Sequence, residues 1–397
     1  MPEDGHVSES NPQFMIFFSL ERWDHVWRRN QFICAGLLER YPALKILWIN
    51  PPIDATANPN WINTFRSGAH AVPDMSRLWT LDLPKLLPNI VGINFNQTLY
   101  LKKIRRALHS LGVVNPIVWV NDQNSVTLVR ALGWSVSVYD VTDDWAAASL
   151  SPRQRTAVIT NDKWLVDNAQ HVVVCSAHLR ELKSAAKSLH LIPNGVDWRR
   201  YHPDNLANVR RPSELSLLTG PIVGYTGTLH EDRLDVDLIC DLSTRVPNCN
   251  FVFVGPNCLS RKNDLRLRTY PNVNLIGAIP YSELPSYVAA FDICMTPHKV
   301  SEFTDSLDPL KLYEYLATGK PVVSTCCAGF RDFPELVQLC ASAEDMAAAI
   351  GSIVATGGPK KLSAARLAYA ANNGWSNRIM QFEALLRISK RTSLVMQ

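Results

Sequence analysis

Short, continuous apolar runs alternate with amphipathic helical segments along most of this 397-residue sequence. The first series of runs is FMIFFSL, KILWIN, PIVWVN, VSVYDV and HVVVCS, and the second, after residue 220, is PIVGYTG, NFVFVG, NVNLIG, FDICMTP and KPVVST. Strands that are apolar on both faces are typical of parallel sheets covered by helices on both sides. The sequence therefore predicts an α/β protein with two doubly wound, Rossmann-like domains, whose ligands bind in a cleft beyond the carboxyl ends of the strands.

The two series are separated by the turn signal Asn194–Gly195 and by a polar stretch that follows it. We expect residues 14–205 to form the first domain, 206–219 to link the domains, and 220–372 to form the second domain. The polar residues 1–13 are expected to be a disordered tail. Residues 373–397 are predicted to form a C-terminal helix.

Composition narrows the class of protein. Hydrophobic residues make up 47% and charged residues 19% of the chain, which is typical of a globular protein, and the net charge of +4 gives no reason to expect a nucleic-acid partner. The nine cysteines contain no C-x-x-C pair, which favours reduced thiols in a cytoplasmic protein and argues against structural zinc. No apolar run approaches the roughly 18 residues that a membrane-spanning helix needs. The oligomeric state is left open.

One basic segment, LYLKKIRRALHSL, has two interpretations. Leu101, Ile104, Leu108 and Leu111 fall on one face of a helix, and four Lys or Arg residues lie elsewhere on it. Such a helix either lies peripherally on the inner face of a membrane or carries an ordinary solvated basic face.

The segment DSLDPLKLYEYLATGKPVVST, residues 305–325, carries the most chemical information. Asp308 fits a helix N-cap, Pro309 the first helical position and Gly319 the position just past the helix end. A helix N-terminus attracts phosphate, and a glutamate about one and a half turns inside it, Glu314, is positioned to accept hydrogen bonds from ribose hydroxyls. Lys311 shares the face of Glu314. The alternative is an ordinary surface helix with one exposed polar face.

This segment resembles the donor site of GT-B glycosyltransferases, particularly the retaining family 4 (group 1). IPNGVDWRRYHP, VGYTGTL, FVFVGP and PNVNLIGAIPYSELPSYVAAFDICMTP are similar to further segments of that family and follow in its order. The resemblance implies the GT-B fold, in which the C-terminal helix, residues 373–397, crosses back to the first domain. It also implies an acceptor-binding first domain, a second domain that binds a nucleotide sugar, retention of anomeric configuration, and no metal or other cofactor. Glu314 matches the family's second glutamate, which holds the ribose. The position of the family's first glutamate is occupied by Ser306, so that glutamate is absent from this sequence. Asp305 and Asp308 flank the position.

The resemblance also implies that positively charged side chains bind the diphosphate. Thr228 occupies the place of the family's arginine and Arg233 lies close to the place of its lysine, so Arg233, followed by Lys311, is our candidate for binding the diphosphate and for catalysis. Loops at Gly255 and from Gly277 to Pro280 are expected to hold the base through backbone groups. The predicted donor-binding set is Gly227, Thr228, Arg233, Gly255, Gly277, Ile279, Asp305, Ser306, Asp308, Leu310, Lys311 and Glu314.

Polar residues that follow strands of the first domain are candidates for the acceptor site. We expect the side chains after the first strand to project towards the cleft, and those after the strand VSVYDV to lie near the donor sugar. The predicted acceptor-binding set is Arg22, Trp23, Asp24, His25 and Asp143. His25 and Asp140 are further catalytic candidates, because each is able to bind sugar hydroxyls or assist proton transfer. The alternatives are a structural histidine and an aspartate that caps the next helix.

Two other patterns are excluded. Asp235–Asp237 imitates a metal-binding D-x-D, but it falls in the first turn of a helix, where carboxylates favour the helix dipole, so we expect no metal there. No G-x-G-x-x-G follows the first strand, which argues against a dehydrogenase. From the resemblance to family 4 we predict a glycosyltransferase that moves a sugar from a UDP- or GDP-sugar to a glycan precursor or a secondary metabolite. A nucleotide-sugar 2-epimerase and a non-catalytic nucleotide-sugar-binding protein are the alternatives.

Overall fold

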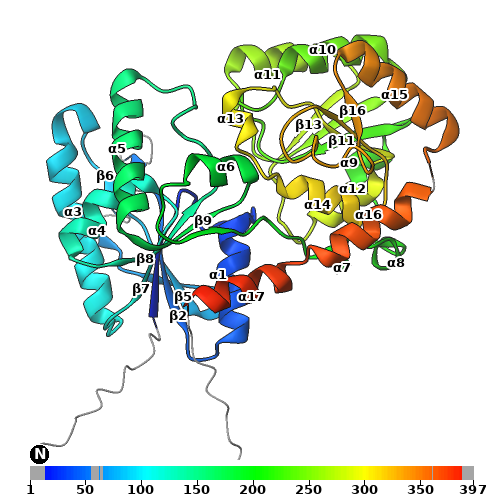
Figure 1. Ribbon diagram of the computed structural model, residues 1–397. Helices are drawn as coiled ribbons and strands as arrows, with labels where there is room; N and C mark the ends of the chain where they lie inside the picture. The colour runs from blue at the N-terminus through cyan, green and yellow to red at the C-terminus, as the bar shows by residue number, and fades with distance from the viewer. Residues whose placement is uncertain (1–13, 55–61, 63–65, 360, 387–397) are drawn as a thin grey trace, which may run out of the picture.

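The computed structural model describes residues 14–54, 62, 66–359 and 361–386. Two α/β domains lie side by side, each built on its own mainly parallel sheet, and the end of the chain returns to the first domain (Figure 1). The predicted tail at residues 1–13 and the last residues of the predicted C-terminal helix, 387–397, lie outside the described residues.

The first domain holds an eight-stranded sheet in the order β10-β9-β8-β7-β1-β2-β5-β4. Its neighbours are parallel except β4 and β5. The strands are β1 (Phe14–Phe18), β2 (Lys45–Ile49), β4 (His70–Val72), β5 (Met75–Leu81), β7 (Ile117–Val120), β8 (Val136–Val141), β9 (Ala169–Val174) and β10 (Leu189–Leu191). A separate short pair joins β3 (Ile53–Asp54) to β6 (Pro84–Lys85).

Helices cover both faces of this sheet, as its continuous apolar strands predict. They are α1 (Arg29–Arg40), α3 (Asn89–Ser110), α4 (Val126–Leu132), α5 (Pro152–Asn168) and α6 (Ala177–Leu182), with a 3-10 turn η1 (Gln123–Ser125). Alternate side chains of β1 point to opposite faces: Ile16 packs in the cluster that includes residues of α3 and α4, and Phe17 in the one that includes residues of α1. Both faces of β1 are buried along its whole length.

The second domain has a six-stranded, all-parallel sheet in the order β13-β12-β11-β14-β15-β16. Its strands are β11 (Ile222–Thr226), β12 (Asn250–Val254), β13 (Val273–Gly277), β14 (Ile293–Thr296), β15 (Val322–Thr325) and β16 (Gln338–Cys340). Its helices are α10 (Val236–Arg245), α11 (Arg261–Leu267), α12 (Leu284–Ala290), α13 (Glu302–Asp305), α14 (Leu310–Ala317), α15 (Ala343–Thr356) and α16 (Lys361–Asn372). Short helices α7 (Trp198–Tyr201), α8 (Pro203–Leu206) and α9 (Ser213–Ser216) connect the two sheets.

Each of the predicted apolar runs contains a strand. The prediction omitted β3, β4, β5, β6, β10 and β16, of which β3 and β6 are two residues long and β4, β10 and β16 three. The exact domain limits stay predictions.

The last helix, α17 (Trp375–Leu386), lies against α1 of the first domain (Figure 1). Its Phe382 packs on Trp119 of β7 with ring centroids 5.2 Å apart. Trp375 stacks on Phe32 of α1 at 4.8 Å. The C-terminal segment therefore crosses back to the first domain and joins the two domains through buried apolar contacts.

Candidate functional site

A cavity of about 380 Å³ lies between the two domains, at the carboxyl ends of β1, β8, β11, β12 and β14. This is the position at which doubly wound sheets bind ligands. The first domain contributes the loops after β1 and β8, and the second contributes the loops after β11 and β12 and the start of α14.

The start of α14 faces this cavity without a side-chain cap. The prediction that Asp308 caps the helix is wrong, because the helix begins at Leu310 with Pro309 at the N-cap position. The Asp308 carboxylate instead accepts hydrogen bonds from the backbone N–H of Asn194, in the first domain, and from the Tyr313 hydroxyl. The first N–H groups of α14 are left available to an anion. Gly319 follows the helix with φ +69°, as predicted.

Lys311, in the first turn of α14, points its ammonium towards the cavity. Burial, followed by repulsion from Arg233, lowers the pKa of Lys311 to about 8. The ammonium lies 5.0 Å from the centre of the Tyr225 ring, and within the described part of the chain it forms no hydrogen bond. A desolvated cation of this kind favours an anionic ligand.

Two glycines bring the backbone of the second domain close to this lysine. Gly227 has φ +127°, and a Cβ built there would lie 3.3 Å from Lys311 Nζ. Gly255 has φ +146°, and its Cβ would lie 2.2 Å from the Gly227 carbonyl oxygen. Only glycine fits this close packing. The loops after β11 and β12 thus form a backbone surface beside Lys311.

Arg233 lies across the cavity and is paired with the first domain. Its guanidinium donates to Asp143 Oδ1 at 2.8 Å, and it lies 5.5 Å from the centre of the Phe303 ring. Both Arg233 and Asp143 line the cavity. Arg233 and Lys311 are near enough for Arg233 to lower the pKa of Lys311.

Glu314 lines the cavity from inside α14 and is 8% exposed. Its Oε1 accepts a hydrogen bond from the Tyr201 hydroxyl at 2.9 Å, and burial raises its pKa. The alternative of a surface helix with an exposed polar face is wrong, since Tyr315 and Thr318 are also buried.

Most of the predicted donor set lines the cavity. Gly277 does not, and its carbonyl accepts from the backbone N–H of Gly255. Asp305 forms an ion pair with Arg331 outside the cavity. Ser306 is fully buried and accepts a hydrogen bond from the backbone N–H of Asp144, across the domain interface. Those lining the cavity are Gly227, Thr228, Arg233, Gly255, Ile279, Asp308, Leu310, Lys311 and Glu314.

The loop after β1 reaches the cavity, but with other side chains than expected. Arg22 pairs with Asp82, Trp23 packs edge-on against Trp48, and His25 is exposed. Asp24 accepts from the backbone N–H of Val26 and pairs with Arg28. None of the four predicted acceptor residues, Arg22, Trp23, Asp24 and His25, lines the cavity; the residues of this region that do are Leu20, Glu21, Val26, Trp27, Arg28, Arg29 and Asn30.

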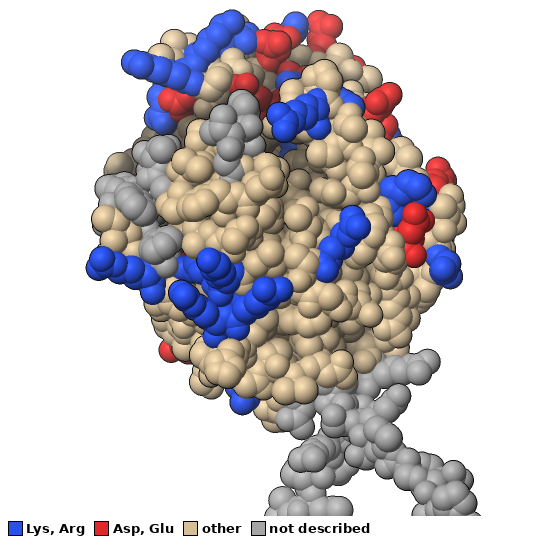
Figure 2. Space-filling view, turned by 90° about the vertical axis from the view of Figure 1, so that its left-hand side faces the viewer, with Lys and Arg blue, Asp and Glu red and all other residues tan. Residues whose placement is uncertain are grey.

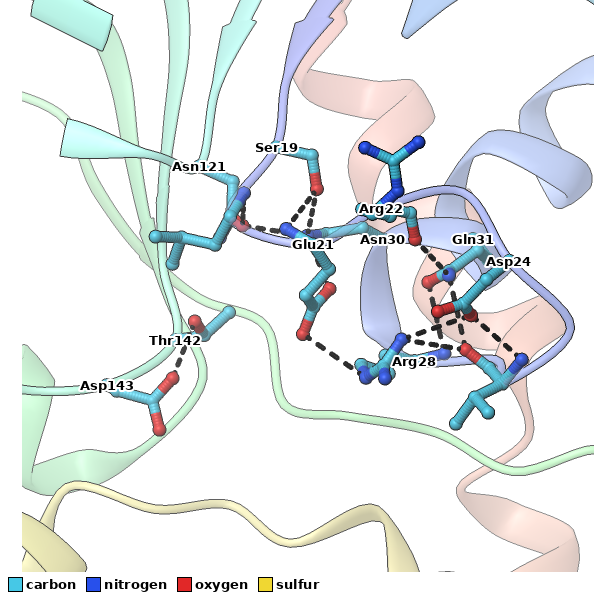
Figure 3. Close-up of polar contacts among 12 residues, drawn as sticks. Ser19, Glu21, Arg22, Asp24, Arg28, Asn30, Gln31, Asn121, Thr142 and Asp143 are labelled. Atoms are coloured by element: carbon cyan, nitrogen blue, oxygen red, sulfur yellow. Dashed lines mark hydrogen bonds and ion pairs between the residues drawn. The ribbon is translucent and has the colours of Figure 1, made fainter. Parts of the chain in front are cut away.

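Glu21 is the most notable residue that the sequence analysis missed. Its Oε2 accepts from Asn30 Nδ2 at 3.2 Å, and its Oε1 lies 3.9 Å from Arg28 Nε. Burial raises the pKa of Glu21 to about 7, against the attraction of Arg28. Figure 3 shows its carboxylate beside Arg28. Glu21 and Asp143 both line the cavity. The sequence does contain a signal for Glu21, since it is a polar residue just after the carboxyl end of a strand.

Asp140 does not line the cavity. It is fully buried and binds Arg29 of α1, whose Nε and Nη2 lie 3.1 and 3.0 Å from its carboxylate oxygens. Arg29 also donates to Asn194 Oδ1 and to the Ile192 carbonyl. The Arg29–Asp140 ion pair therefore stabilises the loops around the cavity.

His298 is a second missed residue, just after β14. Burial, together with Lys311 and Arg233, lowers its pKa well below the usual value, so its imidazole is neutral at pH 7. Its Nε2 lies 3.2 Å from the Tyr225 hydroxyl.

Among the described residues there is no group of three or more His, Cys, Asp or Glu able to hold a metal ion. Asp235 of the D-x-D pattern caps α10 by accepting from the Leu238 N–H at 3.0 Å, and Asp237 lies in the first turn and pairs with Arg266. All nine cysteines are free thiols.

Two sequence comparisons place part of this chain. Residues 220–356 match the family described as Glycosyl transferases group 1. The "Putative teichuronic acid biosynthesis glycosyltransferase TuaH" of Bacillus subtilis (strain 168) is 29% identical over 223 residues. That match covers 52% of this chain and 55% of the relative, so it spans only about half of each.

Solved structures resemble the whole described fold. Sucrose-phosphate synthase from Thermosynechococcus elongatus has a TM-score of 0.72 at 19% identity, covering 95% of this chain and 98% of that one. Anabaena HepE, solved in complex with UDP and glucose, has a TM-score of 0.68 at 14% identity, covering 95% and 100%. These likenesses establish the two-domain fold. The chain therefore has the GT-B fold, and its residues 220–356 are similar to the Glycosyl transferases group 1 family.

Proposed function

We propose that this protein is a glycosyltransferase that moves a sugar from a UDP- or GDP-sugar to a hydroxyl group of a glycan precursor or secondary metabolite. The similarity to TuaH supports glycosyl transfer, and the likeness to HepE, which was solved in complex with UDP and glucose, supports a nucleotide-sugar donor. Retention of configuration, independence of metal ions and a cytoplasmic location belong to the same proposal and rest on the resemblance to family 4 and on the cysteine usage. Among the described residues, no helix is long and apolar enough to cross a membrane.

One observation carries the proposal. Lys311 is a half-buried ammonium that forms no hydrogen bond with any described residue, at the uncapped start of α14 and beside the backbone of Gly227. This arrangement supplies a cation, helix N–H groups and a close backbone surface to one diphosphate. Glu314 lies about one turn further inside the same helix, where its carboxylate accepts the ribose hydroxyls.

The proposed chemistry follows from these charges. As the bond between the anomeric carbon and the diphosphate oxygen breaks, negative charge grows on the departing diphosphate, and Lys311, Arg233 and the α14 N–H groups stabilise it. The acceptor oxygen forms the new bond to the anomeric carbon, and its proton passes to an oxygen of the departing phosphate. We assign no residue as a nucleophile.

A thermal-shift and turnover screen with UDP, GDP and their sugars, with and without EDTA, tests this function. We expect stabilisation by one nucleotide and release of that nucleotide only when an acceptor is added, both unaffected by EDTA. Exchange of deuterium at the sugar C2 without an acceptor would favour the 2-epimerase instead. Nucleotide binding without turnover across the acceptor panel would favour a non-catalytic binding protein.

Glu314→Gln is expected to weaken UDP binding roughly five- to tenfold, because ribose hydroxyls donate more strongly to a carboxylate than to an amide. Glutamine still offers an oxygen to the Tyr201 hydroxyl, whereas alanine would leave that buried group without its acceptor. Isothermal titration with UDP gives the dissociation constant. The exposed Glu335→Gln is the matched control, and equal affinities in the two variants would remove Glu314 from the site.

We also propose that the outer face of the first domain contacts an anionic membrane surface. The sequence from residue 83 to residue 121 contains five Lys or Arg residues and no Asp or Glu. Along α3, exposed Phe95, Lys102, Arg105 and Arg106 recur at helical spacing and form one stripe. Figure 2 shows Lys and Arg side chains gathered on this face with almost no acidic neighbours. Exposed apolar groups beside cations favour a lipid surface over nucleic acid.

Sedimentation with vesicles tests this contact. Lys102→Glu/Arg106→Glu is expected to weaken binding to phosphatidylcholine–phosphatidylglycerol vesicles roughly tenfold or more, since each cation near an anionic surface contributes about 1 kcal/mol. The control Arg261→Glu/Lys262→Glu makes the same charge change on exposed α11 residues and is expected to bind like the wild type. Equal loss in both variants, or equally strong binding to duplex DNA, would contradict a specific membrane face.

A further inference from the structure

Arg233 and Asp143 form an ion pair, but in the proposed function each of them binds a different ligand. Arg233 belongs to the donor side and Asp143, which follows β8, to the acceptor side. Their side chains are 32% and 12% exposed, and Thr142 Oγ1 holds the second Asp143 oxygen at 3.0 Å. Arg233 and Asp143 are therefore bound to each other in this structure.

Glu21 lies close enough to this pair to be affected by both charges. Asp143 raises its pKa and Arg233 lowers it, in addition to the larger effects of burial and of Arg28. Its backbone is fixed on both sides: the N–H donates to Ser19 Oγ at 3.1 Å, and the carbonyl accepts from Trp48 Nε1 at 3.2 Å. The Glu21 carboxylate is therefore held at the cavity wall by the rigid end of the first sheet (Figure 3).

We propose that Glu21 and Asp143 form a binding site for hydroxyl groups of a sugar-like acceptor, and that Asp143 becomes available only when a nucleotide diphosphate takes Arg233 from it. This inference rests on the proposed function. A diphosphate carries more negative charge than a carboxylate and competes for the same guanidinium. Once released, Asp143 offers carboxylate oxygens to hydroxyl donors, as does Glu21 Oε1, whose nearest cation is 3.9 Å away.

The consequence is an order of binding, with the donor before the acceptor. Before the donor binds, Asp143 is engaged and the site for hydroxyls is incomplete. After it binds, the two carboxylates of the first domain face the sugar that the second domain holds. The hydroxyl site and the diphosphate site thus share a single ion pair between the domains.

Asp143→Asn is expected to tighten UDP binding roughly threefold or more, measured by isothermal titration. Arg233 is then no longer held by a carboxylate, and one negative charge near the diphosphate is removed. A purely structural ion pair between the domains predicts the opposite, because its loss would disorder the site and weaken UDP binding. The control Asp264→Asn removes a carboxylate of α11 that pairs with Arg268, neither of which lines the cavity, and it is expected to leave UDP affinity unchanged.

The hydroxyl site is tested with free monosaccharides as probes, by saturation-transfer NMR. We expect signals from glucose, galactose, mannose or N-acetylglucosamine only when UDP is present, and loss of these signals in Glu21→Gln, which still binds UDP. Signals without UDP, signals that survive Glu21→Gln, or no signal with UDP would each overturn the inference. If UDP binds the wild type but Asp143→Asn binds it equally or more weakly, the inference fails and the proposed function stands. If UDP and GDP do not bind the wild type at all, both fail.

Discussion

Lys311→Met is expected to weaken UDP binding about 30- to 100-fold while making the unliganded protein more stable. The loss of affinity is that of a charge-assisted contact to phosphate in a water-poor cavity. The gain in stability, about 1 kcal/mol after allowing for the water that reaches the cavity, arises because folding of the wild type desolvates an ammonium that forms no ion pair with the described residues, and the attraction of Glu314 only partly offsets this cost. Titration with UDP and thermal unfolding at pH 7 measure the two effects.

The pH dependence of this gain has a definite sign. The pKa of Lys311 is lowered from 10.5 to about 8 by folding, so the penalty is fully present below pH 8. Between pH 8 and 10.5 the folded protein loses this proton before the unfolded chain does, and the wild type recovers the lost stability. The advantage of Lys311→Met therefore fades over that range. Lys163→Met, at a surface ion pair, is the control; a destabilised Lys311→Met with normal UDP affinity would contradict this role.

Asp140→Asn is expected to lower the free energy of unfolding by about 3–5 kcal/mol, the usual effect of removing one partner of a buried ion pair. Asp140 is fully buried, and Arg29 is only 5% exposed in its side chain, so the guanidinium would be left without its counter-ion. Urea unfolding followed by tryptophan fluorescence and circular dichroism provides the measurement.

The matched control is Asp167→Asn, which removes the partner of Lys163 in an ion pair whose side chains are 50% and 77% exposed. That variant is expected to change the stability by less than about 0.5 kcal/mol. A stable Asp140→Asn protein that binds UDP but has lost turnover would instead support the catalytic role that the sequence suggested for Asp140.

The sequence predicted the architecture because the information is local. A run such as VSVYDV is apolar on both faces, and only a strand covered by helices on both sides buries it completely. The short strands β10 and β16 were missed because three residues carry no periodic signal. Gly319, Lys311 and Glu314 were found for the same local reason, since their spacing along one helix determines where they lie.

The residues that were predicted incorrectly depend on long-range contacts. Asp308 has the sequence of a helix cap, but its carboxylate accepts from the N–H of Asn194, 114 residues away. The loop after β1 was identified correctly as facing the cavity. Which of its side chains point there is determined by Asn50, which binds the Trp23 N–H, and by Trp48, which binds the Glu21 carbonyl. No pattern within the loop reveals these two anchors.

The aromatic contacts between the domains restrict how the protein admits a substrate. Phe32 stacks on Trp375, and Trp27 stacks on Tyr281 at 5.6 Å, so apolar surface joins the domains on one side of the cavity. Polar contacts such as Arg233–Asp143 join the domains across the cavity. Replacing these polar contacts by contacts with water costs little net free energy, whereas exposing the stacked rings to water is unfavourable. We therefore expect the aromatic side to act as a hinge when a substrate enters, with a rotation about it that accompanies the separation of Arg233 from Asp143.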